Sequence, residues 1–293
     1  MNPIIETIAG YDVYRLENNE GVIWDDVLRA AKSPNKAPVR LLGERVLAQG
    51  GVFSNIELMV AMETGHVICD PPPQNVAGSS IDTTIGHYFY RTGVDDHGKN
   101  SIFNPFDEQS TLEYFGDAQE AEPASTVIKR LGEQAIHRAT LDALQAYPPD
   151  HPVISMAPRE RILAHTNEFI GIRSPGTTSM QSRSTTGRVG WASCLCAGWG
   201  DPGYINRWTM EVYNFNHRWV LIPEGYRMAQ ITMFSTGPVS SEYSKMTGKY
   251  QTVGSDNLET LKGVWQPSFI LPRAYKDPIK SPSVVSGLRE GLI

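Results

Sequence analysis

The chain has 293 residues, of which 40% are hydrophobic and 20% charged, and its formal net charge is -6 at pH 7. A chain of this length buries roughly three quarters of its unfolded surface, enough for one large or two small domains. No run approaches the roughly 18 apolar residues of a membrane span, and the negative charge opposes nonspecific attraction to DNA or RNA. We therefore expect a globular protein that binds a small ligand, and neither a membrane protein nor a nucleic-acid-binding one.

The first residues and the cysteines indicate the compartment. The segment MNPIIETIAG has no basic stretch followed by an apolar one, so we expect no secretory signal and a cytoplasmic location. Cys69, Cys194 and Cys196 are an odd and sparse set, which we interpret as reduced thiols. Only one residue separates Cys194 from Cys196, and no histidine lies at zinc-like spacing, so two small apolar side chains on a strand are a better interpretation than a metal site.

The N-terminal part divides into an extension and the start of a domain. Residues 1–50 form an extension of unknown role with a predicted helix at 24–32; a subdomain, an arm over a neighbouring subunit and a partner-binding segment all stay open. The pattern then predicts a capped helix, with Ser54 as N-cap, Glu57 as its capping-box partner and Gly65 as the stop signal.

Two strands and an insertion follow. Residues 66–70 and 80–90 are predicted strands on either side of a proline-rich loop, and Asp82 is interpreted as a turn or edge residue. A polar insertion occupies about 93–150, and its apolar spacing predicts a helix at 126–147 that ends before two prolines.

The second half of the chain is dense in short strands separated by Gly and Pro. They are predicted at 153–156, 161–166, 168–173, 177–183, 208–213, 218–222 and 226–234. Strands at this spacing with few helices indicate a mainly β fold, closed or nearly closed. We expect one β domain over 51–275 that carries the insertion, and a C-terminal tail over 276–293.

The stretch from Arg183 to Asn214 concentrates polar chemistry. Arg183 and Arg188 bracket the segment Ser-Thr-Thr-Gly, a composition suited to binding phosphate oxygens. An Asp-Pro-Gly turn that begins at Asp201 then leads into an alternating strand that carries Glu211. Thr209, Glu211 and Tyr213 share one face of that strand, and the alternation leaves open whether this face meets solvent or a cavity.

The segments ISMAPRERILAHTNEFIGI, RSTTGRVG, AGWGDPGYINRWTMEVYN and LIPEGYRMAQITMF resemble, in order, the blocks of dCTP deaminases in the dCTP deaminase and dUTPase superfamily. The resemblance covers about 51–92 and 152–254 and leaves the first fifty residues and the insertion unmatched. It implies a distorted, dUTPase-like β-barrel with a few peripheral helices, assembled as a homotrimer with active sites between subunits.

The resemblance also implies roles for residues of the motif. Glu211 would be the general base and acid of cytosine deamination, and Ser184, Thr185 and Arg188 would serve the triphosphate and the catalytic water, with Arg183 beside them in substrate binding. By resemblance no metal activates that water, and the chain lacks the H-x-E and P-C-x-x-C blocks of zinc deaminases. Magnesium is expected only with the nucleotide triphosphate.

A second set of roles concerns the phosphates. In dUTPases the residue corresponding to Asp201 orients a water for attack on the α-phosphate, and the one corresponding to Tyr204 packs against deoxyribose. Some dCTP deaminases with Ala-Gly-aromatic just before Asp-Pro-Gly also hydrolyse dUTP to dUMP, and this chain resembles that variant, with Ala197 and Trp199 at those positions. We therefore carry dUMP formation as a hypothesis.

Two departures from the family pattern stand out. Cys194 replaces a histidine, and a thiol does not supply the hydrogen bonds of an imidazole. The segment Gly-Lys-Tyr-Gln ending at Gln251 resembles the family's phosphate-closing arm, but Val253 replaces a glutamine. By this resemblance Tyr243, Lys249 and Gln251 contact substrate, although Tyr243 and Lys249 are equally interpretable as exposed tail residues.

The leading hypothesis is an enzyme that deaminates dCTP to dUTP in pyrimidine deoxynucleotide metabolism, with hydrolysis onward to dUMP and pyrophosphate left open. One alternative is a dUTPase-like nucleotidohydrolase of shifted base preference. The other is a catalytically weak, nucleotide-binding regulatory relative. Inhibition by dTTP is a further implication of the resemblance.

Overall fold

The computed structural model describes residues 4–8, 11–14, 51–93, 102–133, 142, 144–237, 239–245, 249–250 and 253–279. Most of the N-terminal extension, including the helix predicted at 24–32, lies outside these residues. Its described part is an antiparallel hairpin of β1 (Ile4–Ile8) and β2 (Tyr11–Tyr14).

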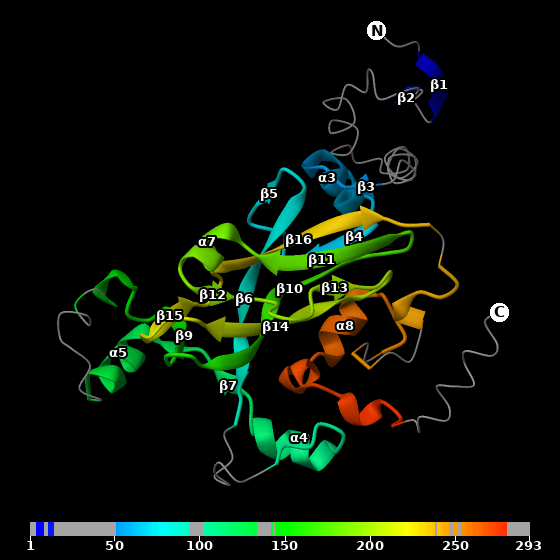
Figure 1. Ribbon diagram of the computed structural model, residues 1–293. Helices are drawn as coiled ribbons and strands as arrows, with labels where there is room; N and C mark the ends of the chain where they lie inside the picture. The colour runs from blue at the N-terminus through cyan, green and yellow to red at the C-terminus, as the bar shows by residue number, and fades with distance from the viewer. Residues whose placement is uncertain are drawn as a thin grey trace.

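The rest of the described chain is mainly β, as predicted, and is built on a curled eleven-stranded sheet (Figure 1). Its central path runs β12-β14-β10-β6-β16-β11-β13. These strands are β6 (Ser80–Arg91), β10 (Arg161–Ile172), β11 (Gly176–Ser182), β12 (Trp191–Ala192), β13 (Trp199–Gly200), β14 (Ile205–Asn214) and β16 (Arg227–Ser235). Short strands pair along it, namely β3 (Gly51–Val52), β4 (Val67–Asp70), β5 (Val76–Ala77) and β7 (Gln119–Glu120).

A second, three-stranded sheet has the order β15-β9-β8. It comprises β8 (Glu122–Pro123), β9 (Pro152–Met156) and β15 (Val220–Pro223). The core lies inside the curl of the main sheet, where one face of β14 contributes Trp208, Met210 and Val212, all buried.

β10 corrects one detail of the sequence analysis, which predicted two strands at 161–166 and 168–173. The structure has one strand with a register shift against β14 between His165 and Phe169. Thr166 bridges the irregularity, since its hydroxyl donates to the Glu168 carbonyl at 2.7 Å and accepts from the Trp208 amide at 2.8 Å. The side chain thus replaces a missing backbone partner and lets the strand continue.

The capped helix is confirmed as α3 (Asn55–Glu63). Ser54 and Glu57 form the reciprocal capping box, with bonds of 2.7 and 3.3 Å. The interpretation of Asp82 is wrong, because this residue is buried within β6. Its carboxylate lies 3.2 Å from Arg183 and 3.0 Å from Arg227, and these two cations offset the cost of its burial.

The insertion forms two described helices, α4 (Glu108–Phe115) and α5 (Ala124–Glu133). α5 is the beginning of the helix predicted at 126–147. Residues 134–141 and 143 lie outside the described part, and a 3₁₀ turn, η2 (Leu144–Ala146), follows them. The sequence analysis missed α4, which begins at an Asp107 cap that accepts from the Ser110 amide at 2.7 Å.

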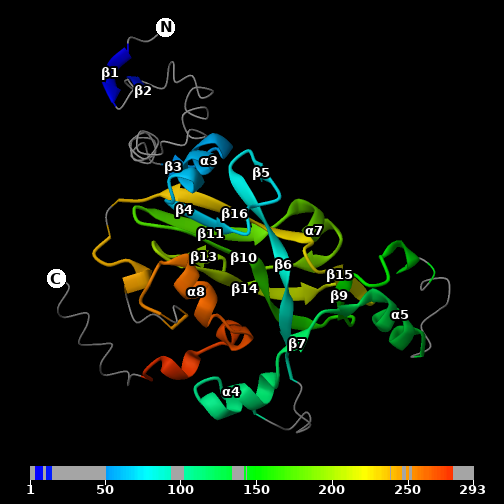
Figure 2. The same cartoon turned by 180° about the vertical axis from the view of Figure 1, so that it is seen from behind.

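The C-terminal segment is folded against the sheet. It contains η3 (Tyr243–Lys245), α8 (Leu258–Val264), η4 (Pro267–Ile270) and η5 (Ala274–Lys276). In both cartoon views this segment lies over the β14 and β10 region and on the same side as α4 (Figures 1 and 2). Among the described helices none is long and apolar enough to cross a membrane.

Candidate active site

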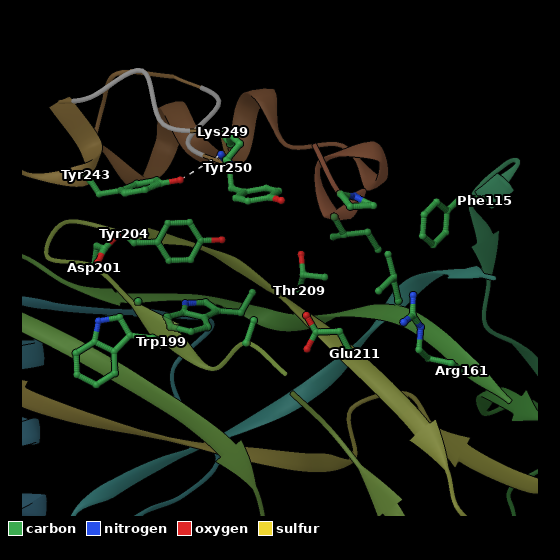
Figure 3. A pocket seen from close by; sticks show the side chains of 16 residues that line it. Phe115, Arg161, Trp199, Asp201, Tyr204, Thr209, Glu211, Tyr243, Lys249 and Tyr250 are labelled. Atoms are coloured by element: carbon green, nitrogen blue, oxygen red, sulfur yellow. Dashed lines mark hydrogen bonds between the residues drawn. The ribbon is translucent and has the colours of Figure 1, made fainter. Parts of the chain in front are cut away.

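A cavity of about 510 Å³ lies between β10 and β14 on one side and the C-terminal segment on the other (Figure 3). Four parts of the chain build its wall: α4, β10, the segment from β13 through β14, and the C-terminal segment. The lining residues are Phe115, Arg161, Leu163, Ala197, Trp199, Gly200, Asp201, Tyr204, Trp208, Thr209, Glu211, Tyr243, Lys249, Tyr250, Ile270 and Pro272.

Glu211 reaches this cavity from the polar face of β14. It is paired across the strands with Leu163 of β10, so both side chains point to the same side of the sheet. Thr209 lines the cavity beside it, and the polar face of β14 therefore meets a cavity and not bulk water.

The carboxyl group of Glu211 is in an unusual electrostatic position. Its Oε2 atom is buried, and none of the residues that the structure describes donates a hydrogen bond to it. Burial raises the pKa of Glu211, whereas the backbone amides of Cys196 and Ala197 and the charge of Arg161 lower it by a smaller amount. A carboxyl with a raised pKa exchanges protons closer to neutral pH, as acid and base catalysis requires.

The Asp-Pro-Gly turn builds another part of the wall. Gly203 has a φ of +86°, and the Tyr204 amide donates to the Asp201 carbonyl at 2.9 Å, which closes the turn. The Tyr204 ring meets Trp208 and Tyr243 edge to face, with centroids 5.2 and 5.3 Å apart. Burial raises the pKa of Tyr204 above its ordinary value, so its hydroxyl stays protonated.

The C-terminal segment forms the roof. The Tyr250 amide donates to the Tyr243 hydroxyl at 3.2 Å, and Arg273 donates to the Lys249 carbonyl at 2.7 Å. The Lys249 ammonium pairs with Asp277. Tyr243 and Lys249 therefore line the cavity, although 36% of the Lys249 side chain is exposed, whereas Gln251 lies outside the described residues.

Four predicted site residues do not line this cavity within one chain. Ser184, Thr185 and Arg188 are exposed on the short helix α7 (Ser184–Arg188). Arg183 precedes that helix and is held by its ion pair with Asp82. The structure thus brings together Glu211, Asp201, Ala197, Trp199, Tyr204, Tyr243 and Lys249, and leaves the phosphate-binding motif apart from them.

The interpretation of the two nearby cysteines as strand residues is wrong. Cys194 and Cys196 lie in the loop between β12 and β13, and Cys194 has a φ of +57°. Ser193 diverts the segment from sheet pairing, because its amide donates to the Ser182 hydroxyl at 2.8 Å. Burial and the charge of Glu211 raise the pKa of the Cys194 thiol, and the amide of the next residue, Leu195, donates to the Glu211 carbonyl at 3.4 Å, so this family departure lies next to the strand that carries Glu211.

The sequence analysis missed the apolar and cationic wall made by Phe115, Arg161, Leu163, Ile270 and Pro272. A signal existed for Leu163, because alternation in the first half of β10 places it on the same face as Arg161. No comparable signal marked Phe115, Ile270 or Pro272, which lie in segments without a recognised motif.

Comparisons with known proteins identify the family of this chain. A family model described as dCTP deaminase-like matches residues 52–236. The dUMP-forming dCTP deaminase of Thermobifida fusca is 28% identical over 204 residues, covering 68% of this chain and 87% of the relative. That of Methanopyrus kandleri is 38% identical over 95 residues, covering 32% of this chain and about half, 49%, of the relative. A solved dCTP deaminase from Agrobacterium tumefaciens has a TM-score of 0.43 at 12% identity and covers 64% of this chain and 48% of its own.

Proposed function

This chain belongs to the dCTP deaminase-like family, and we propose that it deaminates dCTP to dUTP and then hydrolyses dUTP to dUMP and pyrophosphate. The observation that carries the proposal is the carboxyl group of Glu211, which lines a nucleotide-sized cavity with one buried oxygen free of described protein donors. Burial raises its pKa toward the range in which a carboxyl group both takes up and returns a proton.

In the proposed first step a water molecule lies between Glu211 and C4 of the cytosine. Glu211 takes a proton from the water as the C4–O bond forms, and then delivers a proton to the exocyclic nitrogen as the C4–N bond breaks and ammonia leaves. Such acid and base catalysis contributes about 10²- to 10⁴-fold in rate. The backbone amides of Cys196 and Ala197 favour the ionised carboxylate and so limit the rise of its pKa.

The proposed second step uses Asp201, on the side of the cavity near Tyr204 and Trp199 (Figure 3). Its carboxylate orients a water for attack on the α-phosphate of dUTP, which releases pyrophosphate and leaves dUMP. Two observations support this step: Asp201 shares one cavity with Glu211, and the T. fusca and M. kandleri relatives are named as dUMP-forming.

The separation of α7 from the cavity supports a homotrimer with shared sites. Ser184, Thr185 and Arg188 are exposed and do not line the cavity of their own chain, so we propose that they bind the triphosphate of a neighbouring subunit. Val189 follows α7 directly and is exposed, as is Leu195 of the loop after β12, and exposed apolar side chains are suited to such an interface.

The nucleotide is proposed to enter as its magnesium complex, in the cytoplasm and as part of pyrimidine deoxynucleotide metabolism, with dTTP as an inhibitor. Among the described residues no cluster of three or more His, Cys, Asp or Glu could hold a metal. Phosphate oxygens and water are the ligands that magnesium prefers, so the triphosphate itself would carry the ion.

A panel of deoxynucleotides, assayed for both ammonia and pyrophosphate, tests the proposal. Incubation with dCTP is expected to release ammonia and pyrophosphate in equal amounts, with dUMP as the final product. Ammonia without pyrophosphate would remove the second step. Pyrophosphate from dUTP without ammonia from dCTP would favour a dUTPase-like enzyme, and binding of dCTP and dTTP without any product would favour a regulatory relative.

A further inference from the structure

The cavity does not end at Glu211. Trp199, Asp201 and Tyr204 lie on one side of its carboxyl group, and Arg161 and Phe115 lie on the other (Figure 3). A substrate whose phosphates lie toward Asp201 and Lys249, and whose C4 meets Glu211, would present its base to the part of the cavity toward Phe115. We call this part, lined by Phe115, Arg161, Leu163, Ile270 and Pro272, the distal end.

The distal end is mostly apolar and firmly built. Phe115, Leu163 and Ile270 belong to one buried cluster with Tyr90 and Leu271, and they expose only 2%, 4% and 2% of their surface. Tyr114 and Phe103 pack against Phe115 with ring centroids 5.1 and 6.3 Å away. Arg161 supplies the one charge among the five residues, at the side of the space.

The apolar lining of this space fits one side of the base. C4 of cytosine, the carbon under attack, is bonded to N3 and to C5; the N3 side carries hydrogen-bonding atoms, whereas C5 carries only a C–H bond, so an apolar wall suits the C5 side. Leu163 is the cross-strand partner of Glu211 and lies next to it on the same face of the sheet. An apolar group on C5 would meet Leu163, Ile270 and Phe115.

We infer that the preferred substrate is a deoxycytidine triphosphate with a small apolar substituent on C5, of which 5-methyl-dCTP is the simplest. This inference rests on the proposed deamination and names its substrate class. Water adds to C4, the C4–N bond breaks, and the products are dTTP and ammonia, so no oxidant, reductant or further reactant is needed. The methyl group is unchanged and contributes only by burial in the distal end.

The size of the effect follows from hydrophobic recognition. One extra methyl-sized group in a matching apolar pocket changes kcat/KM by about 10- to 200-fold. We therefore expect 5-methyl-dCTP to be used at least about 10-fold more efficiently than dCTP. A wall packed closely against an unsubstituted C5 would instead exclude the methyl group and reverse the preference.

The test is a competition between dCTP and 5-methyl-dCTP in one reaction with the full chain, read at low conversion so that product inhibition does not intervene. Uracil and thymine nucleotides are separated by chromatography, and their ratio gives the ratio of kcat/KM. Equal use of the two substrates, or preference for dCTP, would overturn this inference while leaving the proposed deaminase intact. Deamination of neither would instead remove the proposed function.

Variants that fill the distal end localise the effect. Leu163→Phe and Ile270→Phe come from different segments and are each expected to lower kcat/KM for 5-methyl-dCTP by about 10-fold or more relative to dCTP. Val264→Phe, on the exposed side of α8, is the matched control and should leave the ratio unchanged. A folded filling variant, verified by thermal unfolding, that keeps the wild-type ratio would show that the methyl group does not occupy this space.

Discussion

Replacing Glu211 by glutamine is the most direct perturbation of the site, since it keeps the side-chain shape and removes the ability to take up a proton. If Glu211 moves protons in the rate-limiting step, kcat should fall by about 10²- to 10⁴-fold, equivalent to about 3–5 kcal/mol in the activation barrier. Nucleotide binding should persist, because the substitution leaves the other lining residues and the proposed triphosphate-binding residues of α7 unchanged.

The same variant should gain stability, with a defined dependence on pH. Burial raises the pKa of Glu211 above its ordinary value of 4.5, so the folded state disfavours the ionised carboxylate. Below pH 4.5 both folded and unfolded states carry the protonated form and no penalty exists; as pH rises through the folded-state pKa, the penalty becomes complete. Glu211→Gln keeps a polar side chain there but removes the cost of the buried charge, which we take as about 1 kcal/mol, the lower end for a buried group without a partner, because the residue is only partly buried.

Thermal unfolding of both proteins between pH 4 and 8, together with ammonia release and nucleotide binding, measures these effects. A gain of about 1 kcal/mol corresponds to a Tm about 2–4 °C higher, present at pH 8 and absent at pH 4. Glu113→Gln, at an exposed position on α4, is the control and should change neither activity nor the pH dependence. Retained ammonia release, or a Tm difference that is the same at every pH, would refute the reasoning.

Three further outcomes are expected. Asp201→Asn should let dUTP accumulate from dCTP with little pyrophosphate, as chromatography of the products would show; unchanged dUMP formation would remove Asp201 from the second step. Inactive Glu211→Gln and Arg188→Ala proteins, denatured together and refolded, should regain activity if each site uses two subunits, whereas no recovery would place both residues in one subunit's site. Asp82→Ala should cost about 2 kcal/mol, below the roughly 3–5 kcal/mol for a fully buried pair, because Arg183 and Arg227 are both partly exposed; unchanged stability in denaturant unfolding would contradict this.

The β-rich half of the molecule could be predicted because its signals are local. Alternation in β14 places Trp208, Met210 and Val212 in the core, and Gly or Pro marks most strand ends. The capping box of α3 is likewise contained within four residues. Features that depend on tertiary contacts could not be predicted in this way: the continuation of β10 past its bulge requires the hydroxyl of Thr166 against β14, and the burial of Asp82 requires two arginines distant in sequence.

The residues of the candidate site also differ in whether local sequence or tertiary contacts determine their position. Glu211, Asp201 and Tyr204 belong to one contiguous motif, so their meeting in one cavity followed from the turn and the strand. The tail interpretation of Tyr243 and Lys249 was open because their position depends on Tyr250 and Arg273, which no local pattern links to them. The apolar distal end depends on α4 and the C-terminal segment, whose packing partners are far away in the chain.

The site residues that local sequence predicts and those that it does not predict have different proposed chemical roles. The groups proposed to move protons and orient water come from the segment that resembles other deaminases, and they surround the reacting atoms of any cytosine nucleotide. Of the groups past Glu211, Phe115 comes from the insertion, which no recognised motif covers, and Ile270 and Pro272 lie beyond residue 236, where the family model ends; Leu163 and Arg161 lie on β10. Substrate preference changes most simply through residues that contact the base away from the reacting C4–N bond. Binding energy gained at such residues does not disturb the proton transfers. The distal end, and with it C5 of the base, is therefore where this chain is expected to differ from its relatives.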